Sequence, residues 1–191
     1  MKHIAIFASG TGSNAEKIMQ YFRGHSSIRV ELVVSNKAQA PVLDKARAHQ
    51  VATHVINRSS FYDTRDILEV LSNHQIDLIV LAGFMWLIPS YLVEAYAGRM
   101  LNIHPALLPA YGGKGMYGKH VHQAVHAAGE RKSGITIHQV NERYDEGAVV
   151  FQASCDLSPE DTPEVIARKV QLLEHQYFAP VVEQFMQEQI N

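Results

Sequence analysis

The sequence lacks the features of a secreted or membrane protein. Its single cysteine, Cys155, rules out a disulfide within the chain, and no apolar run is long enough to cross a bilayer. The short apolar start, Ile4 to Ala8, leads into glycines instead of a signal-peptide cleavage site. A net charge of −2 gives no general attraction to nucleic acid or to anionic membranes. We therefore expect a cytoplasmic protein that binds neither nucleic acid nor membranes.

Hydrophobic residues, by contrast, are plentiful and regularly placed. They make up 47% of the 191 residues, which suits one domain (1–191) with a sizeable core. We expect strands at Ile4–Ala8, Val30–Val34, Ala52–Ile56, Leu78–Ala82, Met100–Ile103, Ile135–Val140 and Ala148–Ala153, and helices at Asn14–Phe22, Pro41–His49, Phe61–His74, Tyr91–Tyr96, His122–Ala128 and Thr162–Met186. This order predicts an α/β, Rossmann-like three-layer fold, whose mostly parallel sheet has an antiparallel edge because the last two strands lack a helix between them.

A glycine-rich segment, Ser9 to Asn14, joins the first expected strand to the first helix. Free backbone N–H groups at a helix start suit a phosphate, although a tight turn with an Asn or Ser cap explains the segment equally well. A dinucleotide site would place an acidic residue after the second strand, where Ser35 to Lys37 stands instead. A phosphate monoester is therefore the simpler ligand. NADP remains an alternative, because Lys37 could bind its extra phosphate.

Asn102 and His104 are the most informative pair, because residues two apart on a strand share a face. They lie at the expected carboxyl end of a strand, where open α/β folds bind ligands. An amide there can donate to an oxyanion, and an imidazole can carry protons. The pair alone is more often structural, with the Asn capping a turn and the His bound to a backbone carbonyl.

The residues around Asn102 and His104 favour a functional role for this pair. The segment Asn102 to Pro109 (NIHPALLP) resembles the signature of the formyltransferase family that uses 10-formyltetrahydrofolate. The resemblance covers nearly the whole chain and includes SGTGSN at 9–14, LAGFM at 81–85, SGITIH at 133–138 and YDEG at 144–147. It implies formyl transfer from that co-substrate, without a metal. It points to the members that formylate the amine of glycinamide ribonucleotide in purine synthesis. Whether the protein is a monomer or a homodimer is left open.

The resemblance implies three catalytic groups. Asn102 would stabilise the oxyanion of a tetrahedral intermediate, His104 would act as general acid and proton shuttle, and Asp145 would hold or tune His104. A carboxylate beside an imidazole favours the imidazolium, so we expect Asp145 to raise the pKa of His104. Without the resemblance, Asp145 would be an ordinary turn residue.

The resemblance also implies two substrate sites. The ribonucleotide would be held by Gly12, Ser13, Asn14, Gln171 and Glu174, and the folate by Arg65, Met85, Trp86, Leu87, Ile88, Asn141, Glu142, Arg143 and Tyr144. Read alone, Gln171 and Glu174 are solvent-facing helix residues, and the apolar members are core.

Two segments depart from the family. Trp86 stands where well-known members carry Arg; an indole cannot supply paired guanidinium donors, although it can stack on a flat ring. The loop 111–118 holds four glycines and Lys114, and it is either a mobile surface loop or a contact to an anionic substrate. The i, i+4 pair His122 and His126 has no evident further ligand, so we expect no metal.

His138 faces the same side of its strand as Thr136 and lies either near the site or buried and hydrogen-bonded. Two other functions remain open from the sequence. One is a hydrolase that releases formate from formyl-folate, and the other is a noncatalytic nucleotide- or NADP-binding module.

Overall fold

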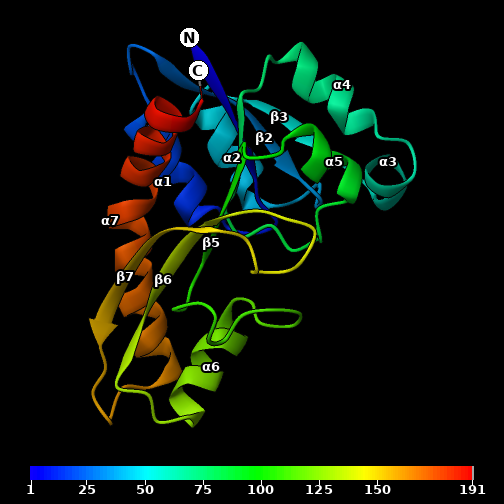
Figure 1. Ribbon diagram of the computed structural model, residues 1–191. Helices are drawn as coiled ribbons and strands as arrows, with labels where there is room; N and C mark the ends of the chain where they lie inside the picture. Colours follow the sequence, from blue (N-terminus) through cyan, green and yellow to red (C-terminus); the bar gives the residue numbers. More distant parts are fainter. Residues whose placement is uncertain (191) are drawn as a thin grey trace.

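The computed structural model describes residues 1–190 (Figure 1). Seven strands form one sheet in the order β3-β2-β1-β4-β5-β6-β7. The strands are β1 (Lys2–Phe7), β2 (Ile28–Ser35), β3 (Ala52–Val55), β4 (Leu78–Leu81), β5 (Met100–His104), β6 (Lys132–Gln139) and β7 (Val149–Asp156). The first five are parallel, whereas β6 and β7 run antiparallel to their neighbours. The predicted mixed α/β sheet is therefore confirmed.

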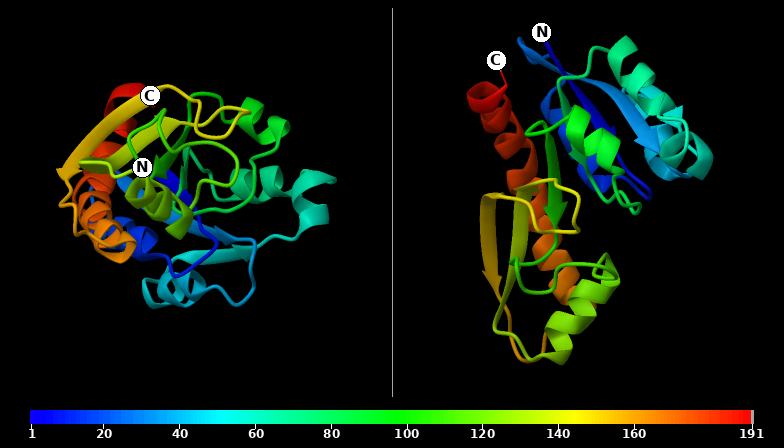
Figure 2. Two further views of the ribbon diagram at one scale, coloured as in Figure 1. Left: turned by 90° about the horizontal axis from the view of Figure 1, so that it is seen from below. Right: turned by 45° about the vertical axis from the view of Figure 1, so that its right-hand side comes forward.

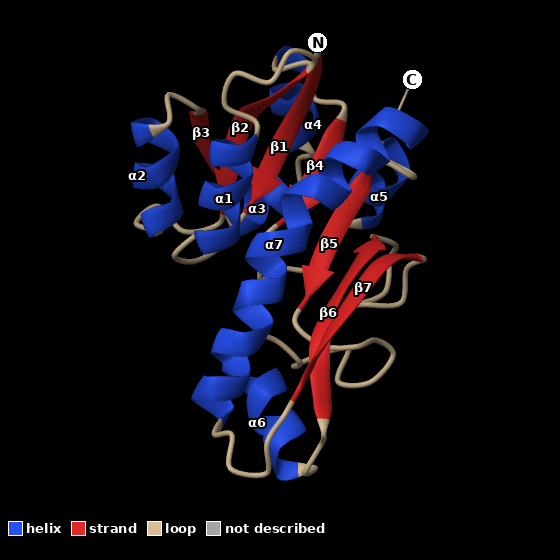
Figure 3. Ribbon diagram, turned by 90° about the vertical axis from the view of Figure 1, so that its left-hand side faces the viewer, coloured by secondary structure: helices blue, strands red, loops and turns tan. Residues whose placement is uncertain are grey.

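The helices cover both faces of this sheet. They are α1 (Ser13–Tyr21), α2 (Pro41–Ala48), α3 (Arg58–Tyr62), α4 (Asp66–Asn73), α5 (Ser90–Ala95), α6 (Lys119–Ala127) and α7 (Pro163–Gln189). Helices α1, α2 and α7, which Figure 3 shows in front of the sheet, pack on one face, and α3, α4 and α5 pack on the other. Among the helices of residues 1–190, none is both long and apolar enough to cross a membrane.

Alternation along the central strands builds a hydrophobic core on each face. In β1, Ile4 and Ile6 pack with α1, α2 and α7, whereas Ala5 and Phe7 pack with α3, α4 and α5. All four side chains are fully buried. Burial on both faces explains why the central parallel strands read as continuous apolar runs.

The predicted helix Phe61–His74 is wrong, because two helices occupy this stretch. The side chain of Asn57 accepts from the backbone N–H of Ser60, and the Ser60 hydroxyl lies 3.1 Å from the backbone nitrogen of Asn57, so a capping box starts α3. Arg65 then adopts a left-handed conformation, with φ of 60°, which breaks the helix before α4 begins. Capping and the left-handed residue thus override an apolar pattern that continues across the break.

The strand order reverses between β1 and β4, which places a cleft at their carboxyl ends. The chain first builds β2 and β3 on one side of β1, then crosses to β4 and β5 on the other. Loops that leave adjacent strands in opposite directions open a crevice between them. Figure 2 shows that β6, β7 and α6 extend beyond the parallel strands.

Candidate active site

A cavity of about 590 Å³ occupies this crevice. Four segments line it: the loop after β1 (10–14), the segment after β4 (83–88), the end of β5 with the glycine-rich loop (102–105 and 113–118), and the segment after β6 (138–145 without 139 and 142), together with Glu174 of α7. Most of the residues expected from the sequence therefore face one cavity.

Gly12 shapes one end of the cavity. Its φ is 69°, in the left-handed region, and a Cβ on it would collide with the side chain of Val42 in α2. Only glycine meets both conditions, so the chain can turn sharply into α1. The backbone N–H groups at the start of α1 consequently border the cavity, in a setting suited to a phosphate.

The residues expected to bind a ribonucleotide meet at this end. The Asn14 side-chain amide donates to Glu174 Oε2 at 3.0 Å, and Gln171 Nε2 lies 3.4 Å from Ser13 Oγ. These contacts join α1 to α7 across more than 150 residues of sequence. Burial raises the pKa of the Glu174 carboxyl, and the hydrogen bond from Asn14 offsets part of that effect.

Asn102, His104 and Asp145 meet in the middle of the cavity. Asp145 Oδ2 lies 3.5 Å from His104 Nδ1, and Asp145 Oδ1 lies 3.5 Å from Asn102 Nδ2. His104 is buried at 3% exposure, and the other two are half-buried. The carboxylate therefore contacts both strand residues from a different segment of the chain.

The hydrogen bonds of His104 define its tautomer. Its Nε2 lies 2.7 Å from the Tyr111 carbonyl oxygen, which only accepts, so Nε2 carries a hydrogen. In the neutral ring Nδ1 is then unprotonated and faces Asp145. Nδ1 is the nitrogen that gains and loses a proton.

The expected rise in the pKa of His104 is wrong in its net direction. Burial lowers this pKa below the ordinary value of 6.5, and His138 adds to the decrease. Asp145 raises it as expected, as does the Tyr111 carbonyl, but the desolvation of a nearly buried imidazole is the larger effect. His104 is consequently neutral at neutral pH.

Asp145 is held tightly in an unusual conformation. Its φ is 57°, in the left-handed region, and the backbone N–H of Gly113 donates to its Oδ2 at 2.9 Å. Burial alone would raise the pKa of this carboxyl, but His138, His104 and the Gly113 N–H together outweigh burial and lower it. Asp145 is therefore a carboxylate at neutral pH.

His138 belongs to the same network, although the sequence left its role open. It pairs directly with Asn102 across β5 and β6, and its Nε2 lies 3.0 Å from Asn102 Nδ2 and 3.6 Å from Asp145 Oδ1. In the sequence, the only indication was that His138 lies two residues after Thr136 and so shares its face of the strand. In the structure, Thr136 pairs with His104 across the same two strands. The register of the two strands, which a single sequence does not reveal, turns that signal into a contact.

The other end of the cavity carries most of the residues expected to bind folate. Its walls include Met85, Trp86, Leu87, Ile88, Asn141, Arg143 and Tyr144. Arg65 and Glu142 do not line it: the Arg65 guanidinium lies 5.4 Å from the centre of the Tyr91 ring, and Glu142 is exposed. The broken helix explains the position of Arg65, because this residue forms the left-handed start of α4.

Trp86 sits in an aromatic group that includes a cation. Its ring lies 5.9 Å from those of Phe61 and Tyr62, and the Tyr62 hydroxyl donates to the Leu87 carbonyl at 2.9 Å. The Arg58 guanidinium of α3 lies 5.4 Å from the centre of the Trp86 ring. A guanidinium is thus present beside Trp86, supplied by a neighbouring helix.

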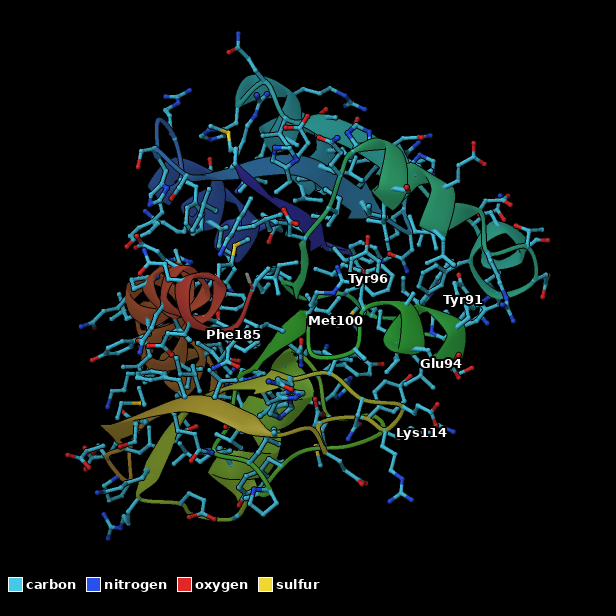
Figure 4. The ribbon with its side chains drawn as sticks, turned by 45° about the horizontal axis from the view of Figure 1, so that its top comes forward. Tyr91, Glu94, Tyr96, Met100, Lys114 and Phe185 are labelled. Carbon is cyan, nitrogen blue, oxygen red and sulfur yellow. The ribbon has the colours of Figure 1, made fainter. Side chains whose placement is uncertain are left out.

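The glycine-rich loop forms a wall of the cavity. Gly113 to Gly118 line it, the Tyr111 carbonyl accepts from His104, and the Gly113 N–H donates to Asp145. A Cβ on Gly112 would press against Asp145 and Leu108, so glycine allows the close approach. Lys114 projects outward from this loop (Figure 4) and is exposed. The loop therefore holds His104 and Asp145 through its backbone.

The histidines of α6 do not form a shared site. His122 is buried at 7% exposure, whereas His126 is exposed and its Nδ1 lies 3.0 Å from the Asp161 carbonyl. Within residues 1–190, no three His, Cys, Asp or Glu side chains are grouped so as to hold a metal ion.

Four histidines that are buried or half-buried lead us to expect that acid destabilises the protein. Burial is the main cause that lowers the pKa of His54, His104, His122 and His175 below 6.5. Below that value the unfolded chain binds more protons than the folded one, so the free energy of unfolding decreases as the pH falls. Glu174, whose pKa is raised, acts in the opposite sense but is a single group.

We expect the Tm from calorimetry to fall by several degrees between about pH 7.5 and about pH 5.5, since roughly 1 kcal/mol corresponds to 2–4 °C in a chain of this size. A Tm that rises over this interval would contradict the burial of neutral imidazoles.

Comparisons with known proteins agree with this geometry. A model of the formyl transferase family matches residues 2–182. Phosphoribosylglycinamide formyltransferase of Bacillus subtilis is 35% identical over 191 residues, covering 97% of this chain and 95% of the relative. The chloroplastic phosphoribosylglycinamide formyltransferase of Arabidopsis thaliana is 40% identical over 195 residues, covering 99% of this chain and 67% of the relative. The crystal structure of phosphoribosylglycinamide formyltransferase from Anaplasma phagocytophilum has a TM-score of 0.90 at 32% identity, covering 100% of this chain and 89% of that one.

Proposed function

Because this chain belongs to the formyl transferase family, we propose that it transfers the formyl group of 10-formyltetrahydrofolate to the amine of glycinamide ribonucleotide in purine synthesis. One observation carries the proposal. Asn102, His104 and Asp145 lie between a glycine-bounded helix start at one end of the cavity and an apolar, aromatic wall at the other. A phosphate-bearing amine and a flat folate can therefore approach the same centre from opposite ends.

We assign the phosphate to the backbone N–H groups of Gly12 to Asn14, and the ribose hydroxyls to Glu174, with Gln171 beside it. The contact between Asn14 and Glu174 at 3.0 Å supports a single ribonucleotide site. Met85 to Ile88 and Asn141 to Tyr144 would surround the folate, without Glu142. The apolar side chains would contact its rings, and the polar ones would bind its hydrogen-bonding groups.

The reaction needs one proton carrier and one group that donates a hydrogen bond to the oxyanion, here called the oxyanion donor. The neutral amine attacks the formyl carbon, so that a C–N bond forms and the carbonyl oxygen becomes an oxyanion, to which an N–H of Asn102 donates. Neutral His104 takes the amine proton on Nδ1, where Asp145 stabilises the imidazolium. The proton then passes to the folate nitrogen as its bond to the formyl carbon breaks, leaving the formylated ribonucleotide and tetrahydrofolate. The lowered pKa of His104 suits this order, because the ring is ready to accept a proton.

Replacing Arg58 tests whether the end of the cavity beside Trp86 binds the folate. Its guanidinium lies over Trp86 without a carboxylate partner among residues 1–190, and the glutamate part of a folate carries two carboxylates. We expect Arg58→Ala to raise KM for formyl-folate about tenfold, as the loss of about 1.4 kcal/mol would, with little change in kcat or in KM for the ribonucleotide. Arg47→Ala, which removes an exposed guanidinium of α2 on the other face of the sheet, is the matched control. Equal KM values in both variants would argue against a folate role for Arg58.

Formate release separates transfer from hydrolysis. With purified protein and formyl-folate, we expect formylated product only when glycinamide ribonucleotide is present, and little formate without it. Rapid formate release that does not respond to the ribonucleotide would favour a hydrolase. Calorimetric titration addresses the noncatalytic alternative, because NADPH binding without binding of the ribonucleotide would overturn the proposal.

Four broader properties are also proposals. The whole chain would act as one formyltransferase domain, as a monomer or homodimer, without nucleic-acid or metal partners. We propose a cytoplasmic location, which the single cysteine supports, while the relative from Arabidopsis thaliana is described as chloroplastic.

A further inference from the structure

His138 is a buried histidine that the proposed reaction leaves without a task. It is 2% exposed, lines the cavity, and stands next to the oxyanion donor instead of the proton carrier. Its two ring nitrogens have different neighbours: Nδ1 lies 2.9 Å from the Gln139 carbonyl, whereas Nε2 lies 3.0 Å from Asn102 Nδ2 and, beyond hydrogen-bond distance, 3.6 Å from Asp145 Oδ1. These contacts determine what the ring can do.

The neighbours of His138 select one neutral tautomer. A carbonyl oxygen only accepts, so Nδ1 carries a hydrogen and donates it to Gln139. Nε2 of the neutral ring then holds a lone pair and accepts from the side-chain amide of Asn102. In this arrangement the nitrogen of that amide, and not its oxygen, lies beside His138.

The two N–H groups of Asn102 are therefore unequal. One is bound to His138 at 3.0 Å, whereas the other faces Asp145 Oδ1 at 3.5 Å, the limit of a hydrogen bond. The weakly held N–H remains available to an oxyanion in its place, while the strongly held one prevents the amide from rotating. A rotated amide would present its oxygen to the developing negative charge and repel it.

We propose that His138 is the positioning residue for the oxyanion donor: its unprotonated Nε2 holds the amide nitrogen of Asn102 at the reaction centre. The inference rests on the proposed function, because it assigns a role within formyl transfer. His138 acts through Asn102, so its contribution depends on the presence of that side chain.

A matched pair of variants isolates the hydrogen-bond acceptor. His138→Gln and His138→Met have similar length and volume, but only glutamine offers an oxygen to the Asn102 amide. We expect His138→Met to lower kcat by about 10- to 100-fold and His138→Gln by less than about fivefold, with KM for both substrates nearly unchanged, since an oxyanion donor contributes about 10²- to 10³-fold. Equal losses in the two variants would overturn the proposal.

A double-mutant cycle tests whether the effect passes through Asn102. In an Asn102→Ala background, assayed under single-turnover conditions with excess enzyme, His138→Met is expected to change the rate by less than about threefold. A loss as large as in the wild-type background would mean that His138 acts on its own or through Asp145. Formyl transfer by the wild type is measured first, so that its failure would count against the function and not against this role.

A measurement on the unaltered protein covers the case in which the variants do not fold. Nitrogen-15 NMR of the ring should show His138 at neutral pH with a protonated Nδ1 and an unprotonated Nε2. The opposite tautomer would remove the acceptor and overturn the proposal.

Discussion

Replacing His104 with alanine is expected to lower kcat for formyl transfer by about 10²- to 10⁴-fold, because it removes the positioned proton carrier. Nδ1 of His104 faces Asp145 at 3.5 Å and Nε2 is bound to the Tyr111 carbonyl. The other imidazole of the cavity, His138, is held by Asn102 and Gln139 and does not replace it. KM for either substrate should change little. The measurement is steady-state kinetics with purified protein and both substrates.

The pH dependence gives the same variant a second readout. Because the pKa of His104 lies below 6.5, the wild-type kcat/KM should fall as the pH drops through that lowered value, and His104→Ala should lose this acidic limb. His126→Ala is the control, since His126 is exposed on α6 and does not line the cavity. Near-normal turnover in His104→Ala would exclude His104 as the proton carrier.

Asp145→Asn should lower kcat by about 10²- to 10⁴-fold, a range comparable to the loss of the carboxylate that orients a catalytic histidine. Asparagine keeps the shape, and its oxygen can still accept from the Gly113 N–H, so the change removes mainly the charge. Because Asp145 raises the pKa of His104, its neutralisation should also move the acidic limb of the rate profile to lower pH.

A neighbouring carboxylate provides the control for Asp145. Glu146 is exposed, contacts Arg143 at 3.2 Å and does not line the cavity. Glu146→Gln should leave kcat within about twofold of the wild type, as is typical of exposed ion pairs that contribute little. Equal effects of Asp145→Asn and Glu146→Gln would indicate a general charge effect instead of a specific role for Asp145.

The sequence predicts the sheet well because burial on two faces leaves a strong signal. The parallel strands appear as apolar runs, and the two strands without an intervening helix form the antiparallel edge. The pattern fails at 61–74, where one left-handed residue, Arg65, breaks a helix that the apolar spacing continues. Local backbone conformation of this kind has no reliable signature in composition.

The site, like the sheet, could be predicted from the sequence only in part. Asn102 and His104 share a strand, so their proximity follows from spacing alone. The position of Asp145 depends on a loop conformation with positive φ, and only the family resemblance pointed to it. The contact of His138 depends on strand register, and the lowered pKa of His104 depends on how completely the fold buries the ring. These are properties of tertiary packing, which residue patterns along one chain do not encode.

A crystal structure with glycinamide ribonucleotide tests most directly whether one cavity joins a phosphate site to the proton carrier. The phosphate should accept from the backbone N–H groups of Gly12 to Asn14, and the amine should lie within hydrogen-bond reach of His104, about 3 Å. A phosphate bound instead beside Lys37 and Gln39, in the second pocket lined by residues 9–11 and 37–41, with the amine directed away from His104, would contradict the proposed reaction.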